Sequence, residues 1–111
     1  MITVDALREY GANTAEGLER CMNNEAFYLR FVNMALEDKG FDALKTAIEA
    51  GDKKASFEAA HALKGLLGNL SLTPIYDIVV ELTELLRAGE DADYEDYLRR
   101  ILEQRDMIAA L

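Results

Sequence analysis

The stretch "AAHALKGLLGNL", residues 59–70, reads as a helix that holds two glycines and the only histidine of the chain, His61. Apolar residues at three- and four-residue spacing continue this helix upstream to about residue 52. A glycine inside a helix costs about 1 kcal/mol relative to alanine. The stretch therefore predicts a long helix in which a specific local requirement keeps Gly65 and Gly68.

A helical wheel at about 100° per residue divides this helix into two faces. His61 lies opposite the apolar face and should be exposed, with the two glycines one and two turns further along on its own side. We therefore expect Gly65 and Gly68 to clear a bare platform beside an exposed imidazole, a role that packing would not explain. The expected core stripe is Ala55, Ala59, Leu63, Leu66 and Leu70, and the outward face also holds Lys54, Phe57, Glu58 and Lys64.

The rest of the chain also predicts helices, because apolar residues keep helical spacing and no segment alternates as a strand does. Thr14, Asn24, Asp52 and Thr73 are expected N-caps, and glycines should end several helices, among them Gly40. Short connections favour antiparallel neighbours, so we expect an up-and-down four-helix bundle with short extra N-terminal helices, all in one domain over residues 1–111. The expected helices are 3–10, 14–21, 25–38, 41–50, 52–70, 74–88 and 92–110, and the third should bury Phe27, Phe31, Met34 and Ala35.

Charge and composition exclude several classes of protein. The 111 residues carry a net charge of −9, which opposes non-specific binding to nucleic acid or to an anionic membrane. A single cysteine, Cys21, excludes an internal disulfide, no signal peptide is visible at the start of the sequence, and no apolar run approaches about 18 residues. We expect a cytoplasmic protein, and a monomer, because the charged face around His61 offers no large apolar patch.

An exposed, neutral imidazole is a good nucleophile near pH 7. Phosphoryl transfer needs mainly positioning and neutralisation of charge. Lys64, three residues after His61 on the same face, can neutralise phosphate oxygens, and Lys54 is a weaker candidate. The chain has no P-loop or other glycine-rich nucleotide motif, so it could receive and pass phosphoryl groups but has no kinase or ATPase activity of its own.

These residues match a known pattern. The segment "HALKGLLGN" (61–69) resembles the His-x-x-Lys-Gly-x-x-Gly core of histidine-containing phosphotransfer (HPt) domains. The upstream segment "GANTAEGLERCMNNEAFYLRFV" (11–32) resembles the N-terminal part of bacterial HPt sequences, and "EAGDKKASFEAAHALKG" (49–65) fits as well. The resemblance covers about residues 4–88.

The resemblance implies a four-helix bundle in which His61 is the phosphoacceptor, usually through Nε2, and Lys64 assists electrostatically. Gly65 and Gly68 would leave room for a response-regulator receiver domain, whose aspartate exchanges the phosphoryl group with His61. The receiver, not this chain, would bind Mg²⁺, and a sensor or hybrid histidine kinase would be the other partner. Many family members have a glutamine on the next helix that hydrogen-bonds the imidazole, but the matching residue here is the shorter Thr83.

Some alternatives stay open. Phe57, Lys54 and Glu58 would belong to the receiver docking surface, although a neighbouring helix, for example residues 1–10, could instead cover Phe57. The chain could be a helical module that binds a receiver or kinase without transfer, or the phosphoacceptor domain of a larger chemotaxis-type or hybrid kinase. Met1 and the length of the chain favour a free-standing protein.

Overall fold

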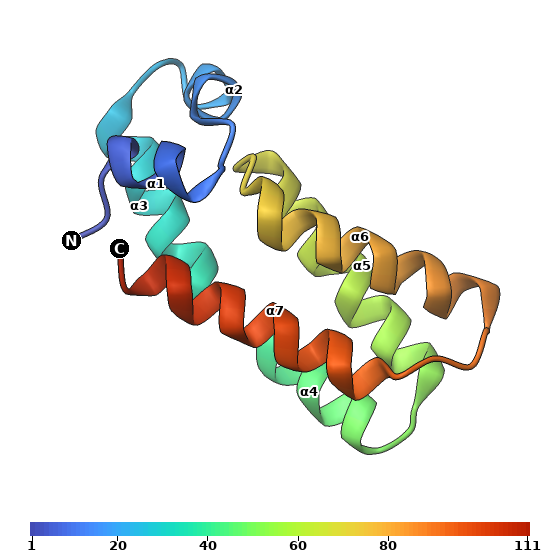
Figure 1. Ribbon diagram of the computed structural model, residues 1–111. Helices are drawn as coiled ribbons and strands as arrows, with labels where there is room; N and C mark the ends of the chain where they lie inside the picture. Colours follow the sequence, from blue (N-terminus) through green and yellow to red (C-terminus); the bar gives the residue numbers. More distant parts are fainter.

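The computed structural model describes residues 1–111 and consists of seven α-helices with no strand (Figure 1). The all-helical class predicted from the apolar spacing is therefore confirmed. None of these helices combines the length and the apolar character needed to cross a bilayer. The helices are α1 (Val4–Tyr10), α2 (Thr14–Arg20), α3 (Glu25–Leu36), α4 (Gly40–Glu49), α5 (Lys53–Asn69), α6 (Thr73–Ala88) and α7 (Tyr94–Ala109).

Four of the helices form a closed bundle. The central helix α5 packs against α4 on one side and α6 on the other, and α7 completes the ring by packing against α6 and α4. Helix α3 extends the bundle near the C-terminal end of α7 (Figure 1). Burying a leucine or isoleucine side chain stabilises a fold by about 1.5–3 kcal/mol relative to leaving it exposed. The fully buried residues of the four bundle helices include Leu44, Leu63, Leu67, Ile75, Leu82 and Ile101.

The N-terminal helices close one end of the bundle, next to the turn that joins α5 to α6 (Figure 1). Most of the polar contacts that hold the N-terminal helices are made with this turn and with the last residues of α5, the helix that carries His61. The hydrogen bonds run from Asn13 N to Ser71 O (2.9 Å), Tyr28 Oη to Leu70 O (2.9 Å), Arg20 Nη1 to Gly68 O (2.8 Å) and Ser71 Oγ (2.9 Å), and Tyr10 Oη to Gln104 Oε1 on α7 (2.7 Å).

Two of the predicted N-caps are confirmed and two are wrong. The side chains of Asn24 and Asp52 accept hydrogen bonds from the first turns of α3 and α5. The cap of α2 is Asn13, one residue before the predicted Thr14, which is buried. Both residue types can cap a helix, and burial of the threonine decides between them.

The start of α6 and the end of α3 also differ from the prediction. Thr73 is the first helical residue of α6 and does not cap it, and its hydroxyl donates to the carbonyl of Ser71 (3.3 Å). Pro74 still occupies the first turn, where its missing N–H costs nothing. Gly40 does not end α3, which stops at Leu36, but begins α4.

The buried faces of α3 and α5 are rotated from those that the wheel predicts. Both helices carry apolar residues over much of their circumference, so spacing alone does not fix which side turns inward. On α5 the hydroxyl of Ser56 donates to Asp52 O (2.7 Å), which lets this polar residue enter the core. The buried residues are Ser56, Ala60, Leu63 and Leu67 on α5 and Tyr28, Val32 and Ala35 on α3; Ala55, Ala59 and Leu66 are half-buried, and Phe27, Phe31 and Met34 are 49%, 44% and 58% exposed.

Candidate functional site

His61 lies on the outward face of α5 and is exposed to solvent. Phe57, one turn earlier, is half-buried, and the centroids of the two rings are 5.7 Å apart with their planes at 37°. None of the hydrogen bonds within the chain involves the imidazole. Neither ring nitrogen is therefore engaged by a hydrogen bond within the chain, and the imidazole is open to a group that approaches from solvent.

Phe57 is covered by α6 and not by residues 1–10. The guanidinium of Arg87, near the end of α6, lies over the Phe57 ring at 5.4 Å from its centroid. Arg87 also pairs with Glu84, with 3.6 Å between Nε and Oε2. The Phe57 ring thus lies close both to the imidazole of α5 and to a cation of α6.

Lys64 is placed one turn after His61, and no carboxylate lies within ion-pair distance of its ammonium group. Its side chain is half-buried and forms no ion pair. It lines a polar cleft between α2, α5 and the start of α6, and the lining also includes Gly65, Gly68, Tyr76 and the acidic residues Glu16 and Asp77. An ammonium group without a carboxylate partner is available to an incoming anion.

The other charged residues predicted for this face are present on it. Lys54 and Glu58 are both exposed and unpaired. Lys53 instead pairs with Asp91, with 3.1 Å between Nζ and Oδ1. Across the chain, no group of three or more His, Cys, Asp or Glu side chains is arranged to hold a metal ion.

The two glycines beside His61 have different surroundings. A Cβ added to Gly65 would meet no atom within 4 Å, so the backbone there is bare, as the wheel predicts. A Cβ added to Gly68 would lie 2.8 Å from Cε1 of Tyr76 on α6. The expectation that packing explains neither glycine is therefore wrong for Gly68, which lets α5 and the Tyr76 ring approach closely.

Comparison with known families relates this site to a protein family. A family model described as the Hpt domain matches residues 29–111, which include α4 to α7 and both His61 and Lys64. The chain belongs to the Hpt domain family. Hpt domains are histidine phosphotransfer modules of phosphorelays, and they interact with receiver domains and kinases. Searches of curated proteins and of solved structures return no match.

Thr83 does not support the imidazole in this Hpt domain. The residue is fully buried, and its hydroxyl donates to the carbonyl of Val79, one turn back on α6, at 2.6 Å. A threonine inside a helix often satisfies its hydroxyl in this way. Thr83 therefore does not take the place of the family's glutamine, because its side chain is buried in the core.

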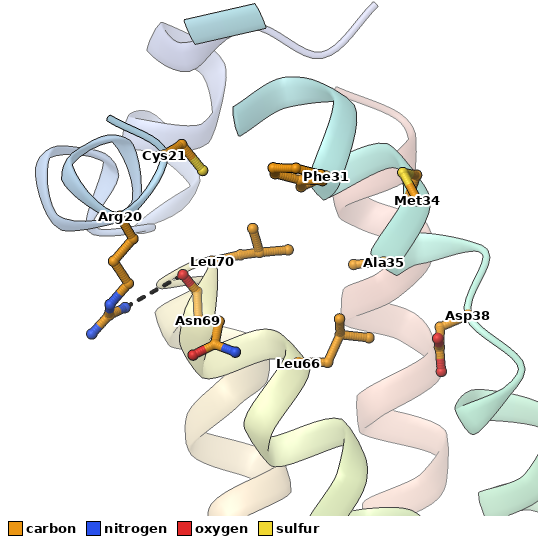
Figure 2. A pocket seen from close by; sticks show the side chains of 9 residues that line it. All are labelled: Arg20, Cys21, Phe31, Met34, Ala35, Asp38, Leu66, Asn69 and Leu70. Atoms are coloured by element: carbon orange, nitrogen blue, oxygen red, sulfur yellow. Dashed lines mark hydrogen bonds between the residues drawn. The ribbon is translucent and has the colours of Figure 1, made fainter. Parts of the chain in front are cut away.

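A second, mostly apolar cleft of about 510 Å³ lies beside α5 in this Hpt domain. Figure 2 shows Phe31 and Met34 reaching toward it from α3 and Leu66 from α5, while Arg20 donates to the carbonyl of Asn69 at its edge. Sequence reasoning missed this cleft because it assigned both α3 residues to the core. The expectation of a monomer considered only the charged face around His61 and took no account of this apolar cleft.

Sequence reasoning also missed Arg87. It is separated from Phe57 by most of two helices, and no motif links the two positions. Only the antiparallel packing of α5 and α6 brings the end of one helix beside the start of the other.

Proposed function

We propose that this Hpt domain accepts a phosphoryl group on His61 and exchanges it with an aspartate of a response-regulator receiver domain. One observation carries the proposal: an exposed imidazole without hydrogen-bond partners lies one turn from an unpaired ammonium and from bare backbone at Gly65. The match of residues 29–111 to the Hpt model supports the same reaction class.

The transfer step uses His61 as a nucleophile. The ring nitrogen without a proton attacks the phosphorus of the receiver's aspartyl phosphate while the other nitrogen keeps its proton. The bond between phosphorus and the carboxylate oxygen breaks, and the carboxylate leaves with the electron pair. The reverse step returns the phosphoryl group to an aspartate. The resemblance to the family favours Nε2 as the attacking nitrogen.

Lys64 stabilises the phosphoryl oxygens during and after transfer. Lys64 lies three residues after His61 on the same helix, so its ammonium can reach a phosphoryl group on His61, and it forms no ion pair within the chain. Mg²⁺ belongs to the receiver in this proposal, where it would offset charge on the same oxygens. This chain would contribute no cofactor.

The receiver docks over the outward face of α5. Gly65 gives its backbone access, and Phe57, Lys54, Glu58 and the exposed part of Gly68 border the contact. A receiver active site is acidic, and this chain has a net charge of −9, so the positive charges of Lys54 and Lys64 matter locally. We further propose that residues 1–111 act as one domain in the cytoplasm, where the buried thiol of Cys21 would stay reduced.

The test is transfer from a phosphorylated receiver with labelled phosphate. The wild-type chain should take up acid-labile, base-stable phosphate, and His61→Gln should fold normally and take up none. Equal labelling of His61→Gln would contradict the assignment of the acceptor. Tight binding of the receiver without any transfer would instead favour a non-transferring interaction module.

A further inference from the structure

The ring of Phe57 restricts a side chain that is otherwise open to solvent. The centroid distance of 5.7 Å to the imidazole lies within the range of about 4.5–7 Å in which aromatic rings attract each other beyond simple burial. The two residues are one turn apart on α5, so their side chains lie on the same strip of the helix surface. Rotation of the His61 side chain to another χ1 rotamer would therefore break its contact with the Phe57 ring.

Phe57 is itself held from a second helix. Arg87 of α6 places its guanidinium over the ring, and Glu84 in turn pairs with that guanidinium. A cation over an aromatic face is attracted to the electrons of the ring. Phe57 is also half-buried, whereas His61 is exposed, so the phenyl ring is the better fixed of the two.

No hydrogen bond within the chain orients the imidazole of His61. Thr83 donates to Val79, and no group in the chain bonds to either imidazole nitrogen. In-line transfer requires the lone pair of the nitrogen to point at phosphorus, so an imidazole that samples all its χ1 rotamers is correctly oriented for only part of the time. Ring contact is the remaining means of orienting His61.

We infer that Phe57 is a positioning residue that restricts the side chain of His61, and that Arg87 acts on His61 by holding Phe57. The consequence for phosphoryl transfer rests on the proposed function of His61. The restriction itself is a property of the free protein and can be measured without any partner.

The first test measures χ1 of His61 by three-bond NMR couplings in the free protein, in which a single histidine leaves no ambiguity of assignment. One rotamer should dominate in the wild type, Phe57→Leu should average the couplings, and Phe57→Tyr should restore them because it keeps the ring. Arg87→Gln should give intermediate averaging. Arg100→Gln is the matched control, because Arg100 lies over the ring of Tyr97 on α7 at 5.3 Å.

The second test measures transfer from a phosphorylated receiver at saturating and subsaturating concentrations. Phe57→Leu should lower the maximal rate constant by about 3- to 10-fold, with rescue by Phe57→Tyr. Arg87→Gln should lower the same constant less and leave the half-saturating concentration unchanged. Circular dichroism and urea unfolding check that each variant is folded.

The outcomes separate the inference from the proposed function. Unchanged couplings in Phe57→Leu, or averaged couplings in Phe57→Tyr, would overturn the positioning role. A wild-type chain that takes no phosphate on His61 would overturn the proposed function instead, and the couplings would still decide whether Phe57 restricts the ring.

Discussion

The ring of Tyr76 on α6 occupies the space that a side chain at Gly68 of α5 would need. A Cβ on Gly68 would come within 2.8 Å of Cε1 of that ring, closer than Cβ atoms approach other atoms in proteins. The same glycine presents its carbonyl to Arg20 of α2. Gly68 is thus part of the packing that joins three helices, while Gly65, one turn earlier, faces open space.

Replacing Gly68 should reveal this packing. Gly68→Ala gains about 1 kcal/mol of helix propensity but forces the Tyr76 ring to move, and overpacking costs about 1–3 kcal/mol. We expect the free energy of unfolding to fall by about 1 kcal/mol. In a Tyr76→Ala background the same substitution should raise it by about 0.5–1 kcal/mol. Urea denaturation of the four proteins measures the coupling, and a stabilising Gly68→Ala in the presence of Tyr76 would contradict it.

Gly65 should respond in the opposite way. Gly65→Ala meets no neighbouring atom, so the free energy of unfolding should rise by about 0.5–1 kcal/mol. Gly65→Leu should also fold, but its side chain would cover the platform beside His61 and slow transfer from a receiver. The measurements are urea unfolding and the transfer rate constant. Full-rate transfer by Gly65→Leu would show that the receiver does not approach over this glycine.

Lys64→Ala should separate activity from stability. We expect about a tenfold lower transfer rate, since the unpaired ammonium no longer offsets phosphoryl charge. The free energy of unfolding should change by less than about 1 kcal/mol, because the half-buried side chain loses only the packing of its stem. Lys54→Ala, on the same outward face, is the matched control and should slow transfer less. Comparable losses of transfer rate in both variants would mean that Lys64 acts only through general attraction of negative charge and has no specific role at the phosphoryl group.

Thr83→Val should leave transfer unchanged. The substitution removes a hydroxyl whose only bond is to the Val79 carbonyl and keeps the shape of the buried side chain. We expect a change of no more than about 1 kcal/mol in unfolding free energy. Thr83→Gln, which places the common family residue here, should lose about 1–3 kcal/mol by overpacking. A folded Thr83→Val protein with slow transfer would show that the Thr83 hydroxyl contributes to the functional site.

Alkaline pH should destabilise the junction between the N-terminal helices and the bundle. Burial raises the pKa of Tyr10 and of Tyr28 to about 12, from about 10 in an unfolded chain. The fold therefore favours the neutral phenols, and their contribution is complete below about pH 10 and is lost as the pH rises through about 12. Urea midpoints measured across this window should fall less steeply for Tyr28→Phe than for the wild type. Parallel curves would mean that Tyr28 does not contribute to the decline.

The features that could be predicted from sequence are those set by short-range chemistry. The caps Asn24 and Asp52 and the glycine at the end of α6 follow from the backbone bonds of single turns. The exposure of His61 agrees with its place opposite the predicted apolar stripe, although the buried face of α5 is rotated from that stripe. Such features involve neighbours within one or two turns, so the sequence contains the necessary information.

The features that could not be predicted depend on which helices meet. Tyr28 is buried in place of Phe27 because its hydroxyl reaches Leu70 across the bundle. Gly68 faces Tyr76, and Arg87 reaches Phe57, only because α5 and α6 run side by side in opposite directions. A helical wheel divides the residues of one helix between two faces and carries no information about the neighbouring helices. It therefore cannot predict these contacts between helices.

The exposed apolar side chains of α3, Phe27, Phe31 and Met34, make the solubility of the domain depend on salt. Two copies with nine surplus negative charges each repel one another, over about 10 Å at 0.1 M ionic strength but only about 3 Å at 1 M. Sulfate and phosphate salts also strengthen contacts between apolar surfaces. Dilute buffer should therefore keep copies apart, whereas concentrated sulfate should favour association through exposed apolar side chains such as Phe31 and Met34.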